Sequence, residues 1–127
     1  MATLAIIGQV LFGLYWLSNG INHFKNLGPM TGYASSKGVA NPKLSVQIAG
    51  LLLLAGGLGI LLGYQIWWAI LARIVFLLLI TFKMHNYWTV SDPQMKMMEQ
   101  VQFMKNMALL GALLLLWTLP AWPYSLI

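Results

Sequence analysis

The residues best suited to chemistry gather in one polar stretch, residues 81–106, which lies between two long apolar runs. It contains His85, three lysines and the only two acidic residues of the sequence, Asp92 and Glu99. A histidine and a carboxylate can exchange protons near neutral pH, and a lysine donates hydrogen bonds to an oxygen or an anion. The stretch is therefore either a solvated cap or a site.

A second polar group ends the first apolar segment. At about 100° per residue, five of its side chains fall within one arc of a helix: Tyr15, Ser18, Asn19, Asn22 and His23. An unsatisfied polar group in hydrocarbon costs several kcal/mol, so this face is expected to turn into the protein.

Four apolar segments are available to position these groups, at about residues 4–24, 44–62, 66–84 and 101–119. Each has close to the roughly 20 residues that cross a hydrocarbon core of about 30 Å. Only Gly63-Tyr64-Gln65 separates the second segment from the third, which predicts a tight antiparallel hairpin. We expect an all-α fold, a bundle of four transmembrane helices in up-down order, formed by residues 1–127 as a single domain.

The fourth helix is predicted to start before it enters the membrane. Asp92-Pro93 is a strong helix-start signal, because Asp caps a helix and Pro suits its first turn. The fourth helix is therefore expected to begin near residue 93 and to project a polar turn or two beyond the membrane.

The composition places the chain in lipid. Of its 127 residues, 60% are hydrophobic and 7% are charged, against roughly 25% charged in soluble proteins. The absence of cysteine excludes disulfide and thiolate chemistry by the chain itself. The net charge of +5 is assigned to loops that flank the membrane, and no nucleic-acid partner is expected.

The two long connections, residues 25–43 and 83–100, fall on the same face of the predicted bundle. Residues 30–36 are a candidate for a short interfacial helix. Six lysines belong to this face, which by the positive-inside rule makes it cytoplasmic and places both termini outside. A lysine-rich functional site would produce the same bias. We expect an integral protein of a bacterial or archaeal cytoplasmic membrane.

The polar groups of residues 81–106 and those that end the first apolar segment lie at the same end of the predicted bundle. They are therefore predicted to converge on one polar chamber. His85 and Lys105 are predicted to donate hydrogen bonds or a proton, and Glu99 to carry the proton away. The residues predicted to bind the ligand are Asn19, Asn22, His23, Asn86, Gln102 and Asn106. The alternative is that these side chains reach the lipid headgroups or join helices as polar contacts.

Arg73 stands apart, about two turns into the third segment and far from both acids. It either extends toward the hairpin surface or contacts a partner subunit or an anionic lipid. Haem held by His23 and His85, or a metal held with Glu99, is disfavoured. Both histidines lie at helix ends and further ligands are lacking, so no metal is predicted.

Short motifs along most of the chain resemble the DoxX/DoxD-like family of small four-helix membrane proteins. The resemblance runs from about residue 13 to residue 116. It rests on six short motifs: Ser18-Asn19-Gly20 with His23, residues 32–39 (GYASSKGV), Gly56-Gly57, His85-Asn86-Tyr87-Trp88, Asp92-Pro93 and residues 103–111 (FMKNMALLG). By this resemblance His85, Lys105 and Asn106 occupy signature positions. The chain departs from the family in lacking an acid before Gly56-Gly57 and in having Arg73 where an aliphatic residue is usual.

The resemblance implies a redox-linked role, and it leaves two hypotheses open. In the first, the chamber binds a quinone headgroup or a small anion as part of a quinone-linked oxidoreductase, with no covalently bound cofactor. In the second, the chain is a non-catalytic accessory subunit of a larger respiratory, oxidoreductase or photosynthetic membrane complex. The glycines of residues 50–63 serve either packing inside the bundle or a homo-oligomer interface.

Overall fold

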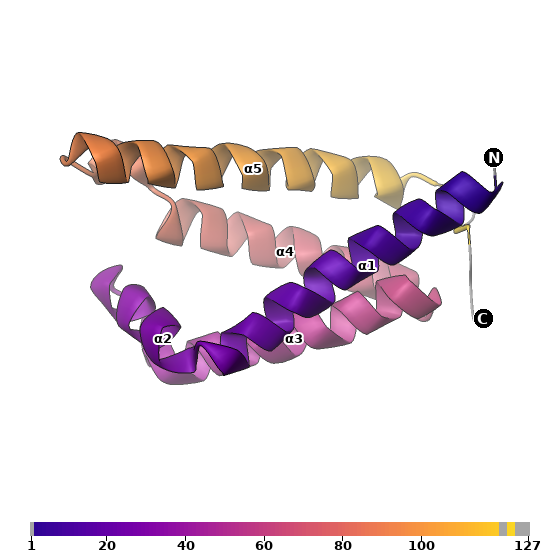
Figure 1. Ribbon diagram of the computed structural model, residues 1–127, viewed down its shortest axis with the longest axis horizontal. Helices are drawn as coiled ribbons and strands as arrows, with labels where there is room; N and C mark the ends of the chain where they lie inside the picture. The colour runs from indigo at the N-terminus through magenta and orange to yellow at the C-terminus, as the bar shows by residue number, and fades with distance from the viewer. Residues whose placement is uncertain (1, 120–121, 124–127) are drawn as a thin grey trace.

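The computed structural model describes residues 2–119 and 122–123, and within them the secondary structure is entirely helical. The long helices are α1 (Ala2–Lys25), α3 (Pro42–Leu62), α4 (Ile66–Met84) and α5 (Pro93–Trp117). The short helices α2 (Leu27–Ser36) and η1 (Tyr87–Thr89) lie in the two long connections. The start of α1 and the end of α5 lie at one end of the molecule, and both long connections lie at the other (Figure 1).

One apolar core joins the four long helices. It contains Trp16 from α1, Leu53 from α3, Ile70 from α4 and Leu113 from α5, each fully buried. A smaller apolar cluster lies near the long connections and is made by Ala34, Val46 and Met84. This second cluster packs α2 against the start of α3 and the end of α4, so α2 is fixed over one end of the bundle.

Glycines allow α1 and α3 to approach each other closely. A Cβ added to Gly20 would lie 2.9 Å from the backbone nitrogen of Leu54, and one added to Gly57 would lie 2.8 Å from that of Leu17. Any larger residue at these positions would push the helices apart. Of the two roles considered for the glycines of residues 50–63, these contacts support packing inside the bundle.

The hairpin between α3 and α4 has the predicted length. α3 ends at Leu62, α4 begins at Ile66, and Gly63 ends α3 in the left-handed region at φ 65°. This conformation has little steric cost for glycine, which explains why the helix stops there. Tyr64 N then donates to Gly59 O at 2.9 Å, which closes the turn.

The start of α5 also agrees with the sequence prediction. Asp92 has extended backbone angles, and its Oδ2 accepts a hydrogen bond from Met95 N at 3.2 Å. Pro93 occupies the first turn, where its missing N–H costs nothing. The short helix expected at residues 30–36 is present as α2 and begins three residues earlier, at Leu27.

Three helices of the described residues are long and apolar enough to cross a membrane: Thr3–Lys25, Pro42–Leu62 and Ile66–Thr89. Large apolar side chains on their outer faces, such as Leu4, Trp68 and Leu79, are exposed, as expected for lipid contact. The sequence predicted four crossings. α5 is not among the three because its first half carries polar residues such as Lys96 and Lys105.

Candidate functional site

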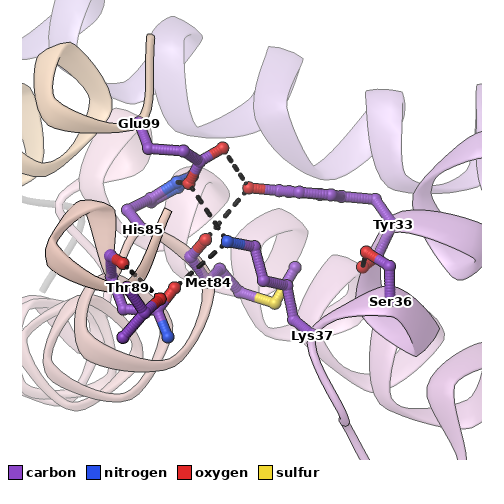
Figure 2. Close-up of polar contacts among 8 residues, drawn as sticks. Tyr33, Ser36, Lys37, Met84, His85, Thr89 and Glu99 are labelled. Atoms are coloured by element: carbon purple, nitrogen blue, oxygen red, sulfur yellow. Dashed lines mark hydrogen bonds and ion pairs between the residues drawn. The ribbon is translucent and has the colours of Figure 1, made fainter. Parts of the chain in front are cut away.

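Five polar side chains meet at the end of the bundle that carries the long connections. They form what we call the loop-end cluster: Tyr33, Lys37, His85, Asn86 and Glu99. In Figure 2, Tyr33 and Lys37 reach toward Glu99 and His85, which come from the opposite side. The cluster therefore links the first long connection to the second.

The carboxylate of Glu99 is the centre of this cluster. Its Oε2 lies 3.0 Å from His85 Nδ1 and 3.8 Å from Lys37 Nζ. Its Oε1 lies 2.5 Å from the Tyr33 hydroxyl. The side chains of Glu99 and His85 are each 15% exposed, so these contacts are partly shielded from water.

His85 is positioned by the end of α4 and by the turn that follows it. His85 is the C-cap residue of α4, and its backbone N–H donates to Thr81 O at 3.2 Å. The next residue, Asn86, is the N-cap of η1, and its carbonyl oxygen accepts from both the N–H and the hydroxyl of Thr89. These bonds fix the backbone at the two residues that carry the cluster on this side.

An aromatic group holds η1 against α4 and α5. The ring of Phe103 lies 5.6 Å from Phe82, 5.4 Å from Tyr87 and 5.6 Å from Trp88, measured between ring centroids. All three contacts are edge-to-face, an arrangement that aromatic rings favour. This packing sets the register of α5 against α4, and so brings Glu99 to His85.

α2 positions the other half of the cluster. Tyr33 and Lys37 are four residues apart, so they lie on one face of a helical turn. Lys37 Nζ lies 5.8 Å from the centre of the Tyr33 ring and donates to Asn86 Oδ1 at 3.1 Å. The Tyr33 hydroxyl also lies 3.0 Å from Met84 O, an end carbonyl of α4, and its single proton serves one acceptor at a time.

The electrostatics of the cluster keep Glu99 ionised and Tyr33 neutral. Burial, the largest single effect, raises the pKa of Glu99, whereas hydrogen bonds from Tyr33 and His85 lower it. The positive charge of Lys37, and that of His85 when its ring is protonated, also lower it, and these effects together outweigh burial, so the pKa of Glu99 lies below its usual value. Burial, together with the hydrogen bond and charge of Glu99, raises the pKa of Tyr33 well above its usual value.

This arrangement leaves one functional atom of His85 available. A carboxylate only accepts hydrogen bonds, so Nδ1 of His85 must carry the proton that Glu99 binds. Nε2 has no hydrogen-bond partner among the described residues. It accepts a hydrogen bond when the ring is neutral and donates one when the ring is protonated, so His85 can exchange a proton with a ligand.

Of the predicted catalytic and binding residues on α5, only Glu99 lies in the cluster. Lys105 is exposed, and it follows Glu99 by six residues, which is about 240° around the helix. Asn106 is buried and Gln102 is half-buried, both further along α5 from the cluster. Neither makes a hydrogen bond to His85 or Glu99 in the described part of the chain.

The predicted residues of α1 are also separate from the cluster. His23 is buried, with its Nδ1 2.8 Å from Asn19 O in the preceding turn and its ring packed edge-on against Phe76. Asn22 is exposed and bonds to Asn26 and to the sulfur of Met30, at the junction with α2. No hydrogen bond joins these α1 side chains to the loop-end cluster within the described residues.

Arg73 was expected to face the hairpin surface, a partner or lipid, and the structure corrects this expectation. Its side chain is fully buried. The guanidinium donates to the carbonyl oxygens of Leu53 and Leu52 on α3 and lies over the Trp16 ring of α1. It fits there because Gly56, the facing residue of α3, has no side chain.

Tyr33 and Lys37 were not predicted as site residues. Lys37 was counted among the lysines that set membrane orientation, and Tyr33 only as part of a motif. The signal that would have found them is their spacing, since residues i and i+4 of a short helix present one polar face. No group of three or more His, Cys, Asp or Glu side chains suited to a metal ion occurs in residues 2–119 and 122–123.

Comparison with known families decides the classification. Residues 4–86 match the family model described as DoxX. The chain belongs to the DoxX family. The match in this DoxX protein covers α1 to α4 and includes Tyr33, Lys37, His85 and Asn86, whereas Glu99 and the motif at residues 103–111 lie outside it.

The family match and the three apolar helices together identify an integral membrane protein. No curated protein and no solved structure matches the sequence.

Proposed function

We propose that this DoxX protein has a redox-linked role in which the loop-end cluster binds the headgroup of a membrane quinone. The observation that carries the proposal is the 3.0 Å contact between His85 Nδ1 and Glu99 Oε2. It fixes one ring nitrogen as the donor to Glu99 and leaves Nε2 for a ligand. Quinone headgroups lie near the membrane interface, and the cluster lies at an end of the apolar bundle.

The charge of the cluster favours a neutral ligand over the small anion that was the other candidate. Glu99 is held ionised and, while the His85 ring is neutral, it offsets the charge of Lys37, which lies 3.8 Å away. An added anion would be repelled by this carboxylate. A quinone oxygen only needs a hydrogen-bond donor, and a quinol hydroxyl only needs an acceptor, and Nε2 of His85 can supply either.

Each residue of the cluster has a distinct task in this proposal. Protonated His85 donates from Nε2 to a quinone oxygen, and neutral His85 accepts the proton of a quinol hydroxyl at the same atom. Glu99 stabilises the charged ring and orients it. Tyr33 and Lys37 hold Glu99 in place, and Asn86 holds Lys37.

The test uses the purified full chain in a non-ionic detergent, titrated with decylubiquinone and followed by the absorbance of the quinone and by tryptophan fluorescence. Saturable binding is expected, with a large loss in His85→Ala and in Glu99→Gln. Lys96→Ala is the matched control, because Lys96 is an exposed cation at the same end of the molecule. Equal binding by the wild type and His85→Ala would contradict the proposal.

The proposal also includes the orientation of the chain in the membrane. We place α5 as the fourth crossing, from about residue 101 to 119, with the loop-end cluster on the cytoplasmic side. The chain has no cysteine, so single cysteines introduced at Ser91 and Gln65 report on the two faces without background. A membrane-impermeant maleimide added to intact cells is expected to label Gln65→Cys and spare Ser91→Cys, and the reverse pattern would overturn this orientation.

A second candidate function, an accessory subunit of a larger membrane complex, is favoured by one specific observation. A row of apolar side chains on α5 is more than half exposed: Met97, Val101, Met104 and Leu115. The spacing of the first three is typical of a helix–helix seam, and methionine adapts to varied partners. Gentle isolation followed by native mass spectrometry tests it, since a free 14.2 kDa chain would count against a permanent partner.

A further inference from the structure

Arg73 is an isolated positive charge inside the helical core. Its side chain is fully buried among α1, α3 and α4. A guanidinium has five N–H donors. One donates to Leu53 O at 2.9 Å and another to Leu52 O. The Nε donor has no hydrogen-bond partner among the described residues.

A second buried donor belongs to the residue that Arg73 contacts. Arg73 Cζ lies 5.5 Å from the centre of the Trp16 ring, and Trp16 is fully buried as well. Trp16 Nε1, which can only donate, also lacks a partner within the described part of the chain. Two contacting, fully buried side chains therefore have more donors than acceptors around them.

Neither of the two acidic side chains of the sequence is placed to balance this charge. The sequence has two acidic residues, and both lie at the opposite end of the molecule. Asp92 caps α5, and Glu99 is bound by the loop-end cluster. Burying an unpaired charge away from water is strongly unfavourable, and main-chain carbonyls and a cation–π contact offset this cost only in part.

We propose that Arg73 and Trp16 form a binding site for a small monovalent anion of about the size of chloride, inside the membrane-embedded part of the bundle. An anion supplies the missing negative charge, and it only accepts hydrogen bonds. Arg73 Nε and Trp16 Nε1 are its donors. This site is separate from the loop-end cluster and does not depend on the function proposed for it.

The depth of Arg73 favours a free anion over a lipid phosphate. Arg73 lies seven residues after the start of α4, which at 1.5 Å per residue is about 10 Å along the helix. Its guanidinium lies against Gly56, six residues before the end of α3, or about 9 Å from that end. Both estimates place the guanidinium below the level of the headgroups.

The test measures thermal unfolding of the purified chain in a lipid-free, non-ionic detergent. Sodium chloride or bromide replaces sodium gluconate at constant ionic strength, because gluconate is too large for an enclosed site. A saturable rise in Tm is expected, since a ligand that binds only the folded state stabilises it. Arg73→Met is expected to abolish the rise, and Lys43→Met, which removes an exposed cation, is expected to keep it.

Two further measurements apply if Arg73→Met does not fold. Trp16→Phe keeps an aromatic ring and removes the Nε1 donor together with the five-membered ring of the indole, so it is expected to weaken bromide binding by at least about fivefold, the equivalent of one hydrogen bond. Anomalous scattering from crystals grown in bromide is expected to show an ion between Arg73 and Trp16.

The same Tm rise in the wild type and Arg73→Met, or no bromide at this position, would overturn the proposal. Arg73-dependent stabilisation by phosphatidylglycerol without any effect of chloride would also overturn it, by assigning the site to a lipid phosphate.

Discussion

Glu99 Oε2 lies 3.0 Å from His85 Nδ1, and this contact joins the end of α4 to the second turn of α5. The other oxygen of the same carboxylate binds the Tyr33 hydroxyl of α2. Three elements therefore converge on one charged group. The ionisation of Glu99 should control both the stability of this end of the molecule and the state of His85.

Glu99→Gln removes the charge and keeps the size of the side chain. The folded-state pKa of Glu99 lies below its unfolded value of about 4.3. Its stabilising contribution is therefore complete above that pH and is lost as the pH falls through the lower folded-state value. Thermal unfolding in detergent between pH 3 and 7 should show this acid-dependent loss in the wild type and a reduced loss in Glu99→Gln.

Asp92→Asn is the control for this measurement, because Asn also caps helices and the change leaves Glu99 intact. At pH 7, Glu99→Gln is expected to lower the free energy of unfolding by about 1.5–3 kcal/mol, the range for hydrogen bonds to a charged group. An identical acid slope in the wild type and Glu99→Gln would show that the carboxylate is not held in this way.

Tyr33→Phe removes the hydroxyl that binds Glu99. The raised pKa of Tyr33 means that its contribution to stability is complete below about pH 10 and is lost as the pH rises through the folded-state value. An absorbance titration of the five tyrosines should show one that ionises above the usual range, and Tyr33→Phe should remove it. The expected loss of stability at pH 7 is about 1 kcal/mol, because this side chain is partly open to solvent.

Tyr64→Phe is the matched control for Tyr33→Phe. Tyr64 is exposed at the hairpin, and its hydroxyl makes no hydrogen bond within the described residues. Loss of the high-pH tyrosine from Tyr64→Phe, and its persistence in Tyr33→Phe, would contradict the assignment.

The helices and one side of the site were predictable because their signals are local. Gly63 ends α3, and Asp92-Pro93 begins α5, through the backbone conformation and hydrogen bonds of a few neighbouring residues. The position of the hairpin and the start of α5 could therefore be predicted from the sequence. His85 and Glu99 flank the same capped turn, and their pairing could be anticipated for that reason.

The i, i+4 spacing of Tyr33 and Lys37 marks a polar face, but their contacts with the rest of the site join elements that lie far apart in the sequence. Tyr33 lies 66 residues from Glu99 in sequence, and only the docking of α2 brings the two together. The burial of Arg73 depends on Gly56, on the neighbouring helix. Lys105 is the exception, because its position on a different face of α5 from Glu99 follows from helical spacing alone.

Phe103→Ala should disturb the loop-end cluster although Phe103 is not one of its residues. Phe103 packs against Phe82, Tyr87 and Trp88, and this packing aligns α5 with the end of α4. The expected loss of stability is about 2–3 kcal/mol, below the range for a fully buried Phe because this one is half-buried. Decylubiquinone binding should weaken in parallel.

Leu79→Ala serves as the control for Phe103→Ala, since Leu79 faces outward on α4 and is mostly exposed. It is expected to change neither stability nor binding appreciably. If Phe103→Ala is destabilised but binds quinone as the wild type does, the aromatic packing does not position the loop-end cluster.

Gly56→Ala should show how tightly α3 encloses Arg73. A Cβ at this position would lie 2.5 Å from Arg73 Cζ, so either the guanidinium or the helix must move. Overpacking of this kind costs about 1–3 kcal/mol. Gly8→Ala is the control, because a Cβ there meets nothing within 4 Å and alanine favours the helix by up to about 1 kcal/mol. Thermal unfolding should therefore move in opposite directions for the two variants.

A double variant identifies the side chain that Gly56 accommodates. Methionine is unbranched and flexible, so Gly56→Ala should cost less in an Arg73→Met background than in the wild type. Equal costs in the two backgrounds would mean that the added methyl group clashes with something other than the guanidinium. A smaller cost would show that the glycine of α3 and the arginine of α4 fit each other, which is the packing that keeps this charge inside the bundle.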